Sequence, residues 1–522
     1  MLLVGGPIWW KTTEVYRVSL PYNRIDALSA TRHFTVHVQL VTIDTHKEHQ
    51  LGPKIQAEIN SEKDPSLMLS LRGRAPTQEE NMAVAKSTTI EELDDHVSRL
   101  HDNFMAGTVF LFEVPVRKFD SGGADIMVGR RRCIYFTRDA DERRLVDILR
   151  ETVVGESNAR KILDSVRAPN HQRSDESLLT RVTASKKYDI LFSLLIPEPE
   201  HVLVRWKIGP AIDSFVTPFI ESLEGLASFD VKSQVLYLAK LNLKTKAEGA
   251  RHTVTQSDLG LAINPVENQL ASHVSVNPRL NFLVYVPATD DKAPLHIVGE
   301  SGGDGVEEPI VFDSNSFLIP RWGGVSIYNV PRSNASVEGR LHSESAPEID
   351  MKKVMSVFLA QLRELLGVQP INEKMLLAEK KTILLPIPSP ESGLRTWEKD
   401  TLSRLRTLEN LELCRVTLSS LSHLLSQIPN IVINDEIGKQ VVDAVRLIEE
   451  SEKHSELGRL TQALESSKAA LSASEKAFFD PSLLALLYFP EDQKYAIYIP
   501  LFLPVLIPVL LSVPTIWTAL RT

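Results

Sequence analysis

Apolar residues recur with two different periods along the chain, and the first half favours strands. Between His33 and Ile43 apolar and polar residues alternate, which is the pattern of a half-buried strand. Helix-like spacing appears at Asp139–Leu163 and Ala211–Leu226. Alternating strands and helices predict an α/β region over residues 11–349, with a mixed sheet layered by helices. The other expected strands are Gly107–Val114, Cys133–Phe136, Ile190–Ile196, Val202–Ile208, Val231–Leu238 and Asn281–Val286.

After residue 350 the apolar spacing changes to steps of three and four. Asp350 is a suitable cap and Gly367 a suitable stop for a first helix. A second apolar stripe predicts a long helix over Glu391–Ile428, and a third run covers Asp435–Phe478 behind Asn434. The last two runs predict a long helical hairpin within a helical region over 350–480. Polar, breaker-rich stretches are expected to be loops, namely Thr45–Thr89, Ala288–Glu308 and Ser333–Pro347.

The C-terminus carries a long uncharged apolar run between Lys494 and Arg521. About 20 apolar residues span a hydrocarbon core, so residues 495–520 predict a C-terminal transmembrane helix. Residues 481–494 then form a juxtamembrane segment, and Phe478–Tyr488 a platform before the membrane. Proline spacing by four places three prolines on one helix face, which we expect to pack on other transmembrane helices rather than lipid. These are Pro500, Pro504 and Pro508.

The N-terminal residues 1–10 are uncharged and end in Trp9 and Trp10. They are too few to span a bilayer and lack the basic segment of a signal peptide. We interpret them as the end of an N-terminal transmembrane helix that is truncated, or as an interfacial anchor.

Composition removes several classes of protein. The 522 residues carry a net charge of −9 with 24% charged and 43% hydrophobic residues, which is typical of a folded chain and unlike a basic nucleic-acid-binding protein. The two cysteines, Cys133 and Cys414, exclude a disulfide scaffold and a cysteine-rich zinc site. Both lie in apolar patterns, which favours buried structural thiols over nucleophiles. His46 and His49 are best explained as solvated side chains rather than metal ligands, and His96 and His101 are equally weak candidates for a metal site.

One motif supports an enzymatic alternative. Asp139-Ala140-Asp141 follows an expected strand, and such paired carboxylates hold a cation and a nucleotide diphosphate in many glycosyltransferases. The same residues also suit a helix start, where Asp139 can cap and Asp141 favours the positive end of the helix dipole. A membrane-anchored lumenal glycosyltransferase therefore stays open as an alternative function. Asn334-Ala335-Ser336 is a glycosylation acceptor if its segment is lumenal.

A series of motifs along nearly the whole chain resembles one family, PIG-S, whose members are subunits of the glycosylphosphatidylinositol (GPI) transamidase. The motifs keep their order from end to end, which makes the resemblance specific. They are Trp9–Glu14, Ser19–Tyr22, Ile263–Glu267, Leu280–Leu283, Pro320–Gly324, Val357–Arg363, Phe478–Leu484, Leu486–Pro490 and Ala496–Pro504.

The resemblance implies a multi-pass protein of the endoplasmic reticulum membrane with its main domain in the lumen. It implies a complex that cuts a C-terminal signal from a precursor and joins the new end to a GPI lipid. The implied partners are PIG-K, which carries the cysteine nucleophile, PIG-T, PIG-U and the anchor attachment protein, together with membrane lipid and no nucleic acid. The expected role is that of a non-catalytic subunit without cofactor or metal, which scaffolds and positions the complex at the membrane.

Overall fold

The computed structural model describes residues 16–28, 34–43, 52–58, 67–101, 107–115, 119, 125–167, 180–248, 251–270, 277–287, 294–299, 314–330, 346–368, 384–386, 393–428, 431–485 and 491–519. The chain forms two compact units. One comprises residues 35–406 and 458–461, and contains the sheets; the other comprises residues 1–34, 407–457 and 462–522, and contains most of the long helices.

The first sheet has six strands in the order β14-β4-β5-β3-β1-β2. β1 is parallel to β3 and β3 to β5, whereas β4 is antiparallel to β5. One face is covered by α4 and α5, whose Val84, Ile90, Leu93 and Val97 share a core cluster with Tyr135. The strands are β1 (Phe34–Val41), β2 (Leu67–Arg74), β3 (Val109–Val114), β4 (Ile126–Val128), β5 (Cys133–Thr137) and β14 (Leu384–Pro386).

The second sheet has five strands in the order β12-β13-β10-β6-β7. All are parallel except β12, which pairs with β13 as an antiparallel hairpin. Phe358 of α12 packs on Phe192 and Phe282 of the central strands, with ring centroids 6.0 and 5.2 Å apart. The strands are β6 (Lys187–Ile196), β7 (Ser228–Tyr237), β10 (Arg279–Tyr285), β12 (Ser316–Ile319) and β13 (Gly323–Ile327).

The two sheets share one strand order. Read in chain order, both follow 2-1-3-5-4 with the fourth strand antiparallel to the fifth, and β14 is added beyond the fourth strand of the first sheet. A hydrogen bond at the start of the central strand recurs as well. Phe110 N–H donates to Arg132 O at 2.8 Å, and Asn281 N–H donates to Trp322 O at 3.0 Å. The α/β region therefore contains two similar topologies, which the sequence did not reveal as a repeat.

A smaller three-stranded sheet, β11-β9-β8, packs on the second sheet through a shared core that includes Val254, Ile297 and Leu283. Its strands are β8 (Lys246–Glu248), β9 (Arg251–Thr255) and β11 (Leu295–Val298). The shorter helices of the α/β unit are α4 (Gln78–Lys86), α5 (Ile90–His101), α6 (Glu142–Asp147), η1 (Ile148–Val154), α7 (Glu156–Arg167), α9 (Ile208–Ala211), η2 (Ile212–Val216), α10 (Thr217–Ser222), η3 (Gln256–Leu261), α11 (Asn264–Leu270) and α12 (Met351–Leu366).

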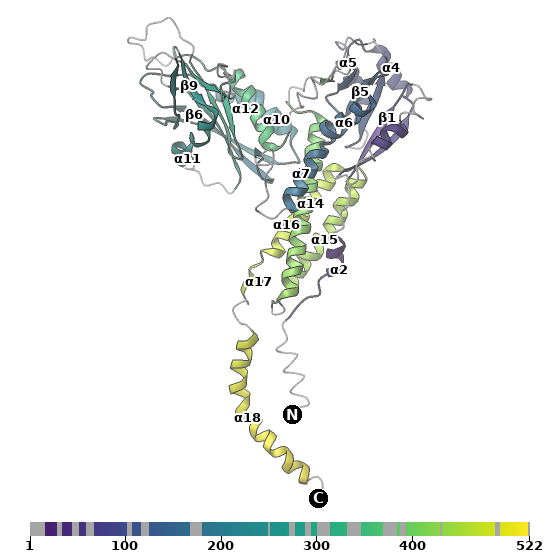
Figure 1. The fold of residues 1–522 in the computed structure, drawn as a ribbon, viewed down its shortest axis with the longest axis vertical. Coiled ribbons are helices and arrows are strands. Elements are labelled where there is room, and N and C mark those ends of the chain that lie inside the picture. Colours follow the sequence, from purple (N-terminus) through teal and green to yellow (C-terminus); the bar gives the residue numbers. More distant parts are fainter. Residues whose placement is uncertain are drawn as a thin grey trace, which may run out of the picture. The chain divides into compact units, whose positions relative to one another are not determined.

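Long helices dominate the other unit. They are α14 (Thr396–Gln427), whose first turns belong to the α/β unit, α15 (Asp435–Glu456) and α16 (Leu460–Phe478), with α2 (Tyr22–Leu28), α17 (Pro481–Ala485) and α18 (Glu491–Ala519) (Figure 1). Asn434 caps α15 as expected, because its Oδ1 accepts from the Ile437 N–H at 2.8 Å. The stripe of α14 is buried along Leu405, Leu408, Leu411, Cys414, Leu418, Leu421 and Leu425.

Three expectations for the fold were wrong. The predicted helical hairpin is three helices, because the run over Asp435–Phe478 breaks at Gly458, whose φ is 71°. The stretch Thr45–Thr89 contains β2 and α4 rather than only loop. Val202–Ile208 is not a strand; Arg205 makes a single bridge to Glu348, and α9 begins at Ile208. In addition, β14 pairs with β4 in the first sheet, and α12 packs on the second sheet through Phe358.

Candidate functional site

The C-terminal helix α18 is the clearest functional element of the chain. Ile499–Thr518 is long and apolar enough to cross a membrane, and within the part that the structure describes it is the one helix that passes this test. The side chains described along this segment are exposed, including Leu501, Leu511 and Trp517. An apolar surface of that size is unfavourable in water and favourable in hydrocarbon. The expected C-terminal membrane helix is therefore present by length and composition.

Proline residues interrupt the hydrogen bonding of α18 without ending it. Pro500, Pro504, Pro508 and Pro514 lie inside the helix and are exposed. Each proline lacks an N–H, so a carbonyl one turn earlier loses its partner. In hydrocarbon such carbonyls need other donors. That the face formed by the first three prolines packs on other membrane helices stays a prediction.

Both cysteines are buried and poorly suited to nucleophilic chemistry. Cys133 on β5 is 2% exposed, and burial together with the nearby Asp94 carboxylate raises the pKa of its thiol. Cys414 on α14 is fully buried and donates to Ala470 O at 3.4 Å. Burial raises the pKa of Cys414 to about 11. Because the thiolate is the reactive form, both side chains act here as packing groups.

The paired carboxylates open a helix. Asp141 is the N-cap of α6, and its Oδ1 accepts from the Arg143 N–H at 3.0 Å. Asp139, the residue expected to cap this helix, lies two residues before the cap and is exposed, so the cap is Asp141 rather than Asp139. Among the described residues, no group of three or more His, Cys, Asp or Glu side chains could hold a metal ion.

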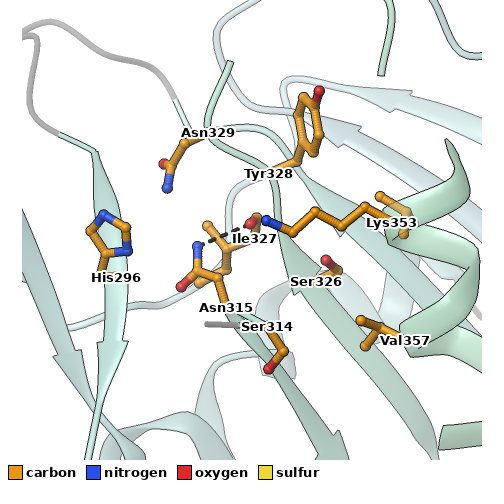
Figure 2. Close-up of a pocket in the computed structure, with 10 residues that line it drawn as sticks. His296, Ser314, Asn315, Ser326, Ile327, Tyr328, Asn329, Lys353 and Val357 are labelled. Atoms are coloured by element: carbon orange, nitrogen blue, oxygen red, sulfur yellow. Dashed lines mark hydrogen bonds between the residues drawn. The ribbon is translucent and has the colours of Figure 1, made fainter. Parts of the chain in front are cut away.

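A cavity of 290 Å³ lies at the carboxyl end of β13, between β11, β12 and the first turns of α12. Figure 2 shows Lys353 of α12 extending toward Asn315 and Ile327, with His296 on the opposite side. Its other lining residues are Ser314, Ser326, Tyr328, Asn329, Val354 and Val357. A cavity of this size with a few polar groups can accept a small polar molecule.

Two asparagines in this cavity hold β11 beside the end of β13. Asn315 accepts from the Ile297 N–H and donates to Leu295 O and Ile327 O, at 3.0, 2.9 and 3.0 Å. Asn315 has a φ of 46°, which asparagine tolerates better than most residues. Asn329 makes a matching pair of bonds to Leu295. Both asparagines therefore have a structural role. Among the described residues that line the cavity, Lys353 is the one with a positive charge.

Burial lowers the pKa of His296, with a further contribution from the positive charge of Arg251. His296 is therefore neutral at pH 7 and can act as a hydrogen-bond donor or acceptor. The cavity was not foreseen from the sequence, because its lining comes from four separate segments. The sequence feature that could have indicated the cavity is the pair Asn315 and Asn329, which flank the β12–β13 hairpin.

Several predicted positions lie outside the described residues. They are the N-terminal residues 1–10, the acceptor Asn334, and the platform residues beyond Ala485 up to Tyr488. Of that platform the structure describes Phe478 and Phe479, whose rings meet edge to face with centroids 5.1 Å apart. Phe479 is 74% exposed, so its ring is available to a partner or to membrane.

Two α/β sheets of similar topology, a set of long helices and one exposed apolar C-terminal helix define a class of α/β proteins that carry a candidate membrane helix. Comparison with known proteins gives the family. The family model described as "Phosphatidylinositol-glycan biosynthesis class S protein" matches residues 1–522, and the chain belongs to this PIG-S family.

Relatives match over the whole length. The mouse (Mus musculus) protein named "GPI-anchor transamidase component PIGS" is 34% identical over 558 residues, covering 100% of this chain and 93% of the relative. The human (Homo sapiens) protein of the same name is 34% identical over 545 residues, with 100% and 93% covered. The Schizosaccharomyces pombe "GPI transamidase component PIG-S homolog" is 24% identical over 506 residues, with 96% and 79% covered.

Proposed function

We propose that this chain is a non-catalytic component of a GPI transamidase complex in the endoplasmic reticulum membrane. The observation that carries the proposal is the full-length match to proteins named as components of that complex. The buried, protonated state of Cys133 and Cys414 supports a role in which the nucleophile belongs to another chain, for which PIG-K is the proposed subunit.

The scaffolding role is supported by α14, which is shared between the two units of the chain. Its first turn is fastened to the β4–β5 hairpin. Trp397 Nε1 donates to Gly129 O at 3.0 Å, and the Trp397 N–H donates to Arg131 O at 3.1 Å. Arg132 Nη2 donates to Asp400 Oδ1 at 3.1 Å. A continuous helix that is bonded to a sheet at one end suits a structural brace.

In the proposed topology α18 spans the membrane and the two-sheet unit lies in the lumen, where precursor and GPI lipid meet. A second, N-terminal membrane helix would make the protein multi-pass, and Asn334 would carry a glycan. The proposed neighbours are PIG-K, PIG-T, PIG-U and the anchor attachment protein. Positioning of reacting molecules by a tethered subunit accelerates a reaction without contributing a reactive group.

Complementation tests the proposal. Cells of the same species whose own gene is disrupted receive either the full chain, a variant lacking residues 491–522, or a variant with α18 replaced by an unrelated membrane helix. The surface level of a GPI-anchored reporter is measured by flow cytometry. The full chain should restore the reporter and the variant lacking α18 should not. Full restoration by the untethered variant would contradict the membrane role of α18, and failure of the well-expressed full chain would contradict the function.

A further inference from the structure

β7 is a long strand that ends the second sheet. It pairs with β6 along its entire length, from Ser228 to Tyr237, and no strand in the described part of the chain pairs with its other side. An exposed edge of this length presents a row of unpaired main-chain donors and acceptors. Such an edge is a template for strand addition by another polypeptide.

The alternation of the strand fixes which residues face outward. Ser228 N–H donates to Lys186 O, and Leu238 N–H donates to Ile196 O, so both bond inward to the β6 side. In a parallel pair, successive residues direct their main-chain groups to opposite sides. The residues between these two at odd positions therefore direct N–H and C=O outward. They are Phe229, Val231, Ser233, Val235 and Tyr237.

A groove of 460 Å³ runs beside this outward row. Ser233, Val235 and Tyr237 line it from β7, Leu194 and Ile196 from β6, and Val204, Trp206 and Ile208 from the segment before η2. Val235 and Tyr237 are 39% and 57% exposed. Trp206 Nε1 is buried and has no hydrogen-bond partner among the described residues.

The lack of charge along the groove indicates which kind of segment it can bind. No charged residue lines the groove among the residues that the structure describes. The two charges on the opposite face of β7 neutralise each other, since Lys232 Nζ lies 3.2 Å from Asp230 Oδ2. Natural sheet edges are commonly protected by charged side chains, by proline or by a bulge. The groove side of this edge has uncharged side chains instead, which complements an uncharged segment with alternating apolar residues.

We propose that β7 receives an extended strand from another subunit of the transamidase complex. The strand would pair with the outward main-chain groups of Val231, Ser233 and Val235 and insert alternate apolar side chains into the groove beside Trp206. The proposal rests on the proposed function, because it takes the partner from the same complex. Strand addition at β7 would give this scaffolding subunit a defined attachment site on the second sheet.

The variant Val235→Pro tests the main-chain pairing. The Val235 N–H points outward, so proline removes a donor from the partner and leaves the β6–β7 ladder intact. The matched control is Val235→Thr, which keeps the N–H and the strand preference. Tyr237→Lys adds a charge at the groove and serves as a second variant if Val235→Pro fails to fold. Full-length chains are expressed in the disrupted cells and the complex is purified in mild detergent through a tag on this chain.

A photo-reactive amino acid replaces Ser233 in the unmodified chain and in each variant. The measurement is the identity and yield of the peptide that crosslinks to it. We expect one peptide from another transamidase subunit, retained in Val235→Thr and reduced at least about tenfold in Val235→Pro and Tyr237→Lys. Crosslinks to lipid, to a second copy of this chain or to nothing, in a complex that purifies intact, would overturn the inference and leave the proposed function standing. If no transamidase subunit co-purifies at all, both the function and the inference fail.

Discussion

The adjacent glycines of β13 give the sharpest test of how the second sheet is packed. A Cβ at Gly324 would lie 1.8 Å from Oε1 of Gln361, whose Nε2 donates to Phe317 O at 3.0 Å. A Cβ at Gly323 would lie 1.7 Å from the main-chain oxygen of Asn281, and the φ of Gly323 is 153°. The first clash is with the end of a flexible side chain and the second with the backbone of the neighbouring strand.

The two glycines therefore predict different outcomes. Gly324→Ala must displace the Gln361 amide, which loses a hydrogen bond and strains the contact at a cost of about 1–3 kcal/mol. Gln361→Ala removes the obstacle, so the double variant Gly324→Ala with Gln361→Ala should be no less stable than Gln361→Ala alone. The coupling between the two sites should be about 1 kcal/mol or more. Gly323→Ala should cost more, and Gln361→Ala should not rescue it.

Hydrogen exchange of the full-length chain in detergent measures these differences locally. Peptides covering β13 and α12 report the opening free energy of this sheet rather than of the whole chain. A destabilisation of about 2 kcal/mol speeds exchange roughly 30-fold when opening is at equilibrium. If Gly324→Ala exchanges like the unmodified chain, or if Gln361→Ala rescues Gly323→Ala equally well, the packing described here is wrong.

Three further predictions concern other parts of the chain. Burial tends to raise the pKa of Glu80, but hydrogen bonds from Arg74, His101 and the Thr77 N–H outweigh it and hold that pKa well below its usual range. The resulting stability is complete above the unfolded pKa of about 4.3 and is lost as pH falls below it, so Glu80→Gln should flatten the acid limb of a hydrogen-exchange profile of α4. Asn at both Asp139 and Asp141 should preserve reporter levels in complementation, since asparagine also caps helices, whereas a transferase would lose all activity. Replacing the three prolines of the proline face by leucine should leave α18 inserted but reduce co-purification of other membrane subunits; the positions are Pro500, Pro504 and Pro508. Unchanged recovery of those subunits would refute the idea that this face packs on other membrane helices.

Local patterns predicted the elements whose determinants are close together in sequence. α12 runs from Met351 to Leu366, with Asp350 accepting from the Lys353 N–H and Gly367 in the left-handed conformation, as its cap and stop signals indicate. The stripe of α14 is buried as its spacing predicts. β1, β3, β5, β6, β7 and β10 form where apolar runs or alternation predict them.

Features set by distant partners could not be predicted in this way. β2 was missed because its second half contains Arg72 and Arg74 and its neighbours are breaker-rich. The apolar run Val202–Ile208 instead supplies Trp206 and Ile208 to the groove beside β7. The common strand order of the two sheets depends on pairings between segments far apart, so no period along the chain reveals it.

The candidate sites divide in the same manner. The membrane helix could be predicted from composition alone, because its function depends on length and apolarity. The cavity near Lys353 and the edge of β7 could not, because each exists only once separate elements are packed. The sequence predicted a helix start at these two carboxylates, but it assigned the cap to Asp139, whereas Asp141 is the cap.

Turnover by the assembled complex, with alanine at both Cys133 and Cys414 of this chain, tests whether this chain is non-catalytic. The complex is purified through this chain from the disrupted cells, its subunit content is matched to that of the unmodified complex, and conversion of a precursor to its GPI-anchored product is timed. A component that braces the complex while another chain supplies the nucleophile predicts the same rate in both preparations. Loss of conversion in an intact complex would show that a thiol of this chain takes part in the reaction.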